Sequence, residues 1–246
     1  EILTTDHEYG ACDYTWDFMC RKTGARYIHQ PIPLPIHSRK EIVEQFWDGV
    51  TSRTKVIYLS HITSSTALRL PVEEICRRAR EHGILTVIDA AHAPGQIPVD
   101  LQALGADIVF GNCHKWMLAP KGSAFLYVRR EVQELIQPLV VSWGTHPTPD
   151  IATGSRFIDI LQWTGTKDPT AALAVRTAIQ FMQDHDWEEV RRQCHALLRQ
   201  GIERICDLTG IPPLYPLDSD FYSQMGIAPL PPSDLVALKA RLYEEF

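Results

Sequence analysis

The feature that most constrains the fold of this chain is the alternation of short apolar runs with helix-like segments. Four runs indicate buried strands, at residues 54–62, 84–90, 106–111 and 123–128. Between the first two, Pro71 suits the first turn of a helix and Gly83 suits its end, and a shorter helix is expected over 99–105. Apolar strands that alternate with helices are typical of a mostly parallel sheet with helices on both faces. The sequence therefore predicts an α/β fold.

Three polar residues follow two of these expected strands. Asp89 and His92 end and follow the run at 84–90, and Lys115 follows the run at 106–111. Functional residues of parallel sheets lie in the loops beyond the carboxyl ends of the strands. The three side chains are therefore expected to converge at that edge of the sheet. Each residue alone is more often an ordinary turn or strand-end residue. A lysine held near the core is favoured as the neutral amine, which makes Lys115 a candidate nucleophile.

Composition excludes several classes of function. The chain of 246 residues has a formal net charge of -6 and no Lys/Arg-rich block, which argues against nucleic acid or an anionic membrane as its main partner. Its apolar runs are shorter than the ~20 residues of a membrane span, and no signal-peptide pattern opens it, so a cytoplasmic protein is expected. Six cysteines without a C-x-x-C pair, and ten histidines without a ligand pair, indicate neither a metal site nor a disulfide framework.

The character of the sequence changes after residue 141. An irregular stretch rich in Gly, Pro and Thr (142–157) precedes two long helical patterns, at 168–185 and 186–210. We predict a major domain over 1–190 and part of a small C-terminal α/β domain over 191–246. The chain opens in a strand-like run without Met and closes in a helix-like pattern, which predicts a fragment that is incomplete at both ends.

Two segments together resemble a known family. The segment VIDAAHAPG (87–95) is followed by ADIVFGNCHKWMLAPKGSAFLYVRR (106–130). This combination resembles the class V aminotransferases, which are fold-type I enzymes dependent on pyridoxal phosphate (PLP). Within this family, the motif HKW…APKGSAFLYV is most similar to the isopenicillin N epimerase-like branch. The cysteine desulfurases form the neighbouring branch.

The resemblance implies roles for individual residues. Lys115 would hold PLP as a Schiff base, Asp89 would pair with the pyridine nitrogen, and His92 would hydrogen-bond near the phenolic oxygen. Ala91 would pack on one face of the ring. These are expectations carried over from the family.

Further positions match the family's cofactor contacts. Asn112 and His114 stand where the family places phosphate contacts, and Tyr9 is the candidate for ring stacking or for an acid. Ser64, with Thr63 as the alternative, would touch the phenolic oxygen.

Thr166 matches a threonine that reaches the phosphate of a neighbouring subunit, which implies a homodimer with shared active sites. The alternative for Thr166 is an ordinary N-terminal cap of the next helix.

The implied reaction begins when a substrate amine displaces Lys115 from PLP, after which Lys115 removes the α-proton. Reprotonation on the opposite face would make the chain an epimerase, whereas loss of a β-sulfur group would make it a cysteine desulfurase or C–S lyase. Cys113 is expected to be a small buried residue rather than a catalytic one. The alternative of another class is an inactive or incomplete PLP-fold fragment, because the family's phosphate-binding turn would precede Glu1 and its substrate-binding arginine would follow Phe246.

Overall fold

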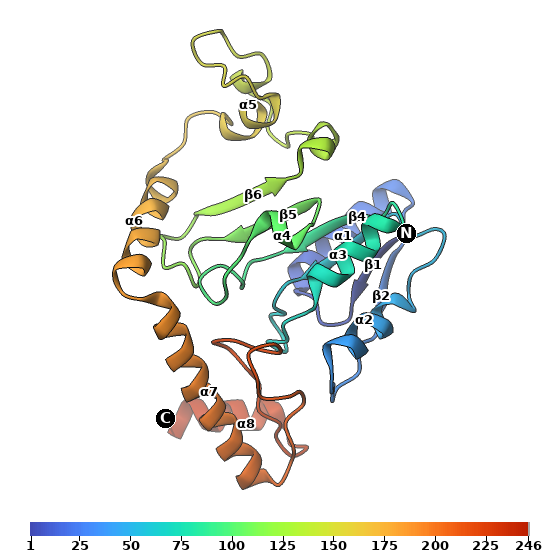
Figure 1. Cartoon of the computed structure of the whole chain (residues 1–246), viewed down its shortest axis with the longest axis vertical. Coiled ribbons are helices and arrows are strands. Elements are labelled where there is room, and N and C mark those ends of the chain that lie inside the picture. The colour runs from blue at the N-terminus through green and yellow to red at the C-terminus, as the bar shows by residue number, and fades with distance from the viewer. Residues whose placement is uncertain (246) are drawn as a thin grey trace.

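The computed structural model describes residues 1–245 and has a six-stranded sheet at its centre (Figure 1). The strands lie in the order β2-β1-β3-β4-β5-β6. All neighbouring pairs are parallel except β5 and β6, which are antiparallel. The predicted α/β fold with a mostly parallel sheet is thus confirmed. The strands are β1 (Ile2–Thr5), β2 (Tyr27–Gln30), β3 (Val56–Ser60), β4 (Leu85–Asp89), β5 (Ile108–Asn112) and β6 (Ala124–Val128).

Several helices of the described residues begin or end at local sequence signals. The α-helices are α1 (Gly10–Thr23), α2 (Arg39–Trp47), α3 (Val72–Glu81), α4 (Leu101–Leu104), α5 (Arg156–Gln162), α6 (Thr170–Asp184), α7 (Trp187–Thr209) and α8 (Leu235–Glu245). Short 3-10 helices cover Arg130–Leu135 and Trp143–Thr145. Gly105 and Gly210 adopt the left-handed conformation that ends α4 and α7. Pro71 is the N-cap of α3, so it stands one position before the first turn where the sequence predicts it.

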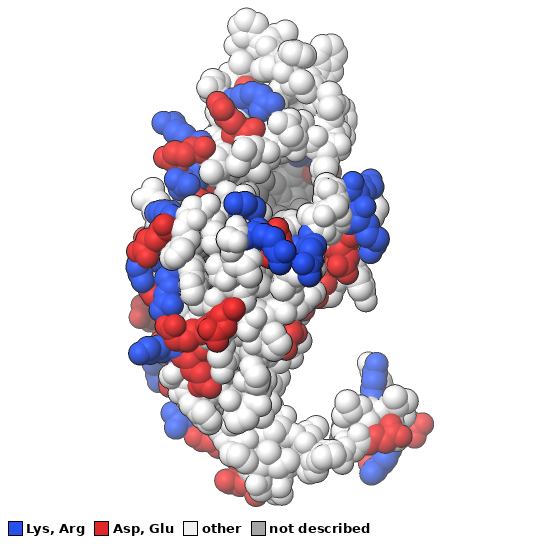
Figure 2. Space-filling view, turned by 90° about the vertical axis from the view of Figure 1, so that its right-hand side faces the viewer, with Lys and Arg blue, Asp and Glu red and all other residues white. Residues whose placement is uncertain are grey.

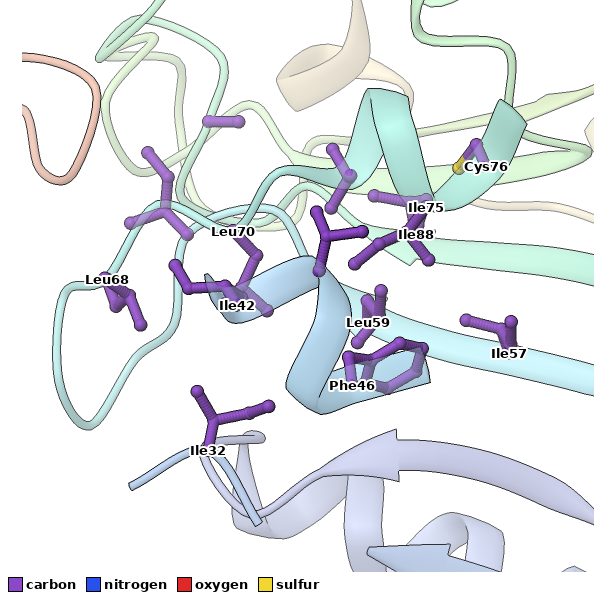
Figure 3. Close-up of a cluster of buried hydrophobic side chains, with 14 of the residues drawn as sticks. Ile32, Ile42, Phe46, Ile57, Leu59, Leu68, Leu70, Ile75, Cys76 and Ile88 are labelled. Carbon is purple, nitrogen blue, oxygen red and sulfur yellow. The ribbon is translucent and has the colours of Figure 1, made fainter. Parts of the chain in front are cut away.

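The central strands β3 and β4 are buried on both faces of the sheet. Side chains alternate along a strand, so Ile57 and Leu59 of β3 point to one face and Tyr58 to the other. The first face packs against α2 and α3, and Figure 3 shows Phe46 and Ile75 of these helices in the same buried cluster. On the opposite face the ring of Tyr58 lies 5.5 Å from that of Trp16 in α1. Because both faces are covered at these central strands, a site formed by them opens at the ends of the strands.

The C-terminal half runs along one side of the sheet. In Figure 1, α6 and α7 descend past the sheet edge, and α7 continues without a break through residue 190, where the sequence predicts a domain boundary. That boundary stays a prediction. Beyond α7 the chain returns to the main buried cluster through Tyr215 and Tyr222, whereas α8 buries no side chain.

The surface carries charges of both signs. Figure 2 shows Lys and Arg interspersed with Asp and Glu over the face in view. Among the helices of residues 1–245, none combines the length and the apolar character needed to cross a membrane.

Candidate active site

Three strands end side by side at the carboxyl edge of the sheet. Ser60 of β3 pairs with Asp89 of β4, and Asp89 pairs with Phe110 of β5. These residues open into a cavity of about 130 Å³. Seven of the residues predicted for the site line this cavity: Tyr9, Ser64, Asp89, Ala91, His92, Asn112 and Lys115. The parallel topology therefore brings together side chains from four separate parts of the chain.

Four further lining residues are not predicted by the sequence: Cys12, Ser60, Ile62 and Phe110. A signal for Ser60 and Phe110 was present, because each stands near the end of an apolar run, as Asp89 does. Cys12 lies in α1, a helix that the sequence analysis does not predict, so no local pattern points to it.

Asp89 is a carboxylate that is only 5% exposed. The amide of Ala91 donates to its Oδ1 at 2.8 Å, the hydroxyl of Tyr58 donates to its Oδ2 at 3.3 Å, and the thiol of Cys12 donates to Oδ2 at 3.6 Å. None of these donors is a cation, and burial raises the pKa of the carboxyl above its ordinary value. A protonated pyridine nitrogen would supply the cationic hydrogen-bond donor that this carboxylate lacks. The donor set around Asp89 therefore fits PLP.

His92 links Lys115 to Trp116. Its Nε2 lies 3.2 Å from Nζ of Lys115, and its Nδ1 accepts a hydrogen bond of 3.1 Å from the indole N–H of Trp116. Burial, followed by the nearby charge of Lys115, lowers the pKa of His92 to about 4. The imidazole is therefore neutral near pH 7, so Lys115 lies beside a hydrogen-bonding group rather than a second cation.

The turn after β4 holds the Lys115 loop in place. Gly95 has a φ of +90°, and a Cβ added to it would lie 2.2 Å from the carbonyl oxygen of Trp116. Only glycine lets the two backbones approach this closely. The indole N–H of Trp187, at the start of α7, donates to the carbonyl of Gly95 at 2.9 Å. Glycine is thus required at the end of VIDAAHAPG because the backbone there contacts the loop that contains Lys115.

A second buried carboxylate, Glu8, lies next to the cavity. The amide and hydroxyl of Ser60 donate to its Oε2 at 2.9 and 2.6 Å, and the hydroxyl of Thr5 donates to its Oε1 at 2.7 Å. Burial raises the pKa of Glu8 to about 7. Glu8 is not among the residues predicted from the sequence, and it lies three residues beyond the end of β1. Glu8 ties the start of α1 to β3 and so places its neighbour Tyr9 at the cavity.

Two predicted residues do not line this cavity. His114 directs its Nδ1 at the carbonyl oxygen of Ser123, 3.2 Å away, and Thr166 is exposed between α5 and α6. Of the two alternatives in the loop after β3, Thr63 is fully buried and its hydroxyl accepts a hydrogen bond within its own loop. Ser64 is the one that faces the cavity.

Sequence comparison places the chain among known enzymes. The family model described as Aminotransferase class-V matches residues 1–219. An isopenicillin N epimerase from Amycolatopsis lactamdurans is 34% identical over 256 residues, which cover 100% of this chain and 64% of that protein. An L-cysteine desulfhydrase from Arabidopsis thaliana is 31% identical over 168 residues, which cover 65% of this chain and 36% of that protein.

Solved structures agree in fold. The apo structure of a cysteine desulfurase from Thermococcus onnurineus NA1 matches with a TM-score of 0.77 and 20% identity, over 99% of this chain and 60% of that one. A cystine C–S lyase matches with a TM-score of 0.70 and 22% identity, over 84% of this chain and 55% of that one. The chain thus spans 64% of the length of the epimerase that it matches. Class V aminotransferases and cysteine desulfurases use PLP. The family model, the epimerase relative and the shared fold together show that the chain belongs to the class V aminotransferase family.

Proposed function

We propose that this chain is a PLP-dependent enzyme that acts on an amino acid, with Lys115 as the residue that holds the cofactor. One observation carries the proposal: the amine of Lys115 and the buried carboxylate of Asp89 open into the same cavity, beyond the ends of β5 and β4. A lysine amine can bind the aldehyde of PLP covalently, and a carboxylate can keep a pyridine nitrogen protonated.

The other residues would contact the remaining parts of the cofactor. Ala91 and Tyr9 would flank the ring, and Ser64 would hydrogen-bond near the phenolic oxygen. Asn112 and His114 would contact the phosphate. The position of four of these five residues around one cavity supports the assignment.

When bound, PLP supplies an electron-accepting ring that takes up the electron pair left on the α-carbon after loss of a proton. Asp89 would hold a proton on the ring nitrogen and so would keep the ring a strong electron acceptor. Nζ of Lys115, as a neutral amine, accepts the α-proton and returns a proton to the substrate. His92 is neutral and hydrogen-bonded to Lys115, so it holds the amine in place without adding positive charge.

We favour an epimerase-type reaction. Its support is that the isopenicillin N epimerase relative covers the whole of this chain at 34% identity. Epimerisation needs a second group that returns a proton to the opposite face of the α-carbon. Tyr9 is the candidate, because it lines the cavity and is 51% exposed.

Cysteine desulfurase or C–S lyase chemistry is the second candidate. The L-cysteine desulfhydrase from Arabidopsis thaliana supports it at 31% identity, over 65% of this chain. The two reactions share the removal of the α-proton and differ only in the later steps, so both would use Lys115 and Asp89 in the same roles.

Spectroscopy and mass spectrometry test cofactor binding. Protein mixed with PLP should gain a visible absorbance band, and reduction with borohydride should leave the cofactor attached to the peptide that contains Lys115. Lys115→Ala should abolish both signals. Lys121→Ala, an exposed lysine of the same loop, should leave both unchanged. Protein that stays colourless with PLP would contradict the proposal and favour the inactive or incomplete fragment.

Two incubations separate the candidate reactions. An epimerase should exchange the α-proton of its amino acid for deuterium in D2O, with the product appearing as the opposite enantiomer. A lyase or desulfurase should release sulfide or persulfide from L-cysteine. Sulfide release without enantiomer formation on any amino acid of a broad panel would overturn our preference for the epimerase.

We also propose a homodimer with shared active sites. Thr166 lies outside the cavity of its own chain, which leaves it available to the cofactor phosphate in a second copy. Exposed apolar side chains offer a surface for such a copy: Tyr14 and Phe18 of α1 are 75% and 49% exposed. Sedimentation equilibrium should give the mass of two chains, and a monomer that binds PLP fully would contradict the dimer. A cytoplasmic location stays a prediction.

A further inference from the structure

Three side chains form a line of hydrogen bonds at the cavity. The indole Nε1 of Trp116 lies 3.1 Å from Nδ1 of His92, and Nε2 of His92 lies 3.2 Å from Nζ of Lys115. An indole N–H can only donate, so Nδ1 must be the acceptor. A neutral imidazole has one N–H, which must then be on Nε2. Nε2–H then points at Nζ of Lys115, and it can donate to that nitrogen when the amine is neutral.

We propose that Trp116 is a positioning residue that holds His92 as the neutral Nε2–H tautomer and thereby directs an N–H at the amine of Lys115. The catalytic meaning of this arrangement rests on the proposed function, since it matters only if Lys115 is the reactive lysine. The tautomer itself follows from the contact between Trp116 and His92.

The proposal explains why His92 does not become a cation beside Lys115. An imidazolium has an N–H on both nitrogens, and the N–H of Trp116 would then point at another N–H instead of a lone pair. Burial acts in the same direction. The other titratable groups that line the cavity with His92 are Lys115, Asp89, Tyr9 and Cys12. A neutral amine is the form in which a lysine acts as a nucleophile.

Backbone contacts around these side chains hold His92 and Trp116 next to each other. The carboxamide of Gln96, itself buried, donates to the carbonyl of His92 at 2.8 Å. The turn at Gly95 touches the backbone of Trp116. His92 and Trp116 are therefore each fixed to the same contact between two loops, so their rings meet without a long flexible connection.

Nuclear magnetic resonance of protein without PLP tests the inference directly. In wild-type protein labelled with ¹⁵N in His and Trp, we expect Nδ1 of His92 to be unprotonated and to show a scalar coupling to Nε1 of Trp116 across the hydrogen bond. A protonated Nδ1 in the wild-type protein would overturn the proposal. This measurement needs no variant, so it does not depend on whether any substitution folds.

A variant tests the consequence for protonation. Trp116→Phe keeps an aromatic ring and removes the N–H, so the pKa of His92 should rise by about one unit, which corresponds to one net hydrogen bond. Trp47→Phe is the matched control: this indole packs 5.2 Å from the ring of His82 in a remote part of the fold, and its loss should leave His92 unchanged. An unchanged His92 in Trp116→Phe would refute the role of the indole N–H.

The outcomes separate this inference from the proposed function. If the protein takes up PLP on Lys115 but shows no coupling between Trp116 and His92, only the positioning role fails. If the coupling is present and the protein stays colourless with PLP, the proposed function fails and the tautomer assignment stands.

Discussion

Replacing Gly95 with alanine tests whether close contact between two loops builds the active site. Gly95 has a φ of +90°, and its added Cβ would lie 2.2 Å from the carbonyl oxygen of Trp116, 2.4 Å from its carbonyl carbon and 2.9 Å from the amide nitrogen of Met117. All three are backbone atoms, so no side-chain rotation relieves the overlap and one loop must move. Because Lys115 directly precedes Trp116, that movement should displace Nζ from His92.

Two contributions make up the loss of unfolding free energy expected for Gly95→Ala. An alanine in the left-handed region costs about 1–2 kcal/mol relative to its preferred conformation, and relief of an overlap inside a packed site costs a further ~1–3 kcal/mol. Gly122 separates them, because its φ is +94° and its nearest neighbour is Cβ of Ala171 at 4.0 Å, an ordinary contact. Gly122→Ala should therefore lose about 1–2 kcal/mol of unfolding free energy, and Gly95→Ala about 2–5 kcal/mol.

Urea unfolding followed by circular dichroism measures both variants against the wild-type protein. Absorbance after addition of PLP then reports whether Lys115 is still placed to take up the cofactor, which we expect to be impaired in Gly95→Ala and normal in Gly122→Ala. Equal destabilisation of the two variants would refute the argument, since it would leave only the backbone conformation and no contribution from the contact with Trp116.

Three further changes test the site. Asp89→Asn should leave PLP attached to Lys115 but slow exchange of the substrate α-proton by about 10²-fold, as expected for loss of a charged partner worth on the order of 3 kcal/mol; an unchanged rate of deuterium incorporation by NMR would remove Asp89 from the mechanism. Burial raises the pKa of Glu8 from 4.5 to about 7, so the folded protein binds this proton more tightly than the unfolded chain and loses stability as pH rises. Wild-type protein should lose ~2–3 kcal/mol more unfolding free energy than Glu8→Gln between about pH 5 and about pH 8, and parallel urea curves at the two pH values would contradict this. Mixed dimers of Lys115→Ala and Thr166→Val subunits should regain activity above that of either parent, because one of the two sites then has both native residues; activity no higher than the parents would argue against shared sites.

The central strands and the main site residues could be predicted because their signals are local. β4 lies inside its predicted apolar run and β5 ends one residue beyond its own run, and Asp89 and Lys115 end or follow these strands. The carboxyl ends of parallel strands share one edge, so a correct assignment of strands is enough to bring these two residues to one cavity. No knowledge of side-chain packing was needed for that step.

The first fifty residues show where local patterns fail. β2 is a four-residue edge strand without a fully buried side chain, so it lacks the apolar signal of the central strands. α1 buries only Cys20 and has Tyr9 as an N-cap without a capping side chain, so neither an apolar stripe nor a start signal marks it. The contribution of Cys12 to the cavity depends on this helix and was therefore not predictable.

The partnership of Trp116 with His92 depends on the fold at a finer level. The two residues belong to different loops, and the distance between the loops is set by Gly95, whose missing side chain is visible in the sequence while its close contact is not. The direction of the hydrogen bond is also invisible in the sequence. The indole N–H determines which imidazole nitrogen has the proton, and this in turn determines which charge state of Lys115 can accept a hydrogen bond from His92. The two motifs thus combine residues that would touch the cofactor with residues that orient them: Gly95 brings the loops together, Trp116 orients His92, and His92 holds the amine of Lys115.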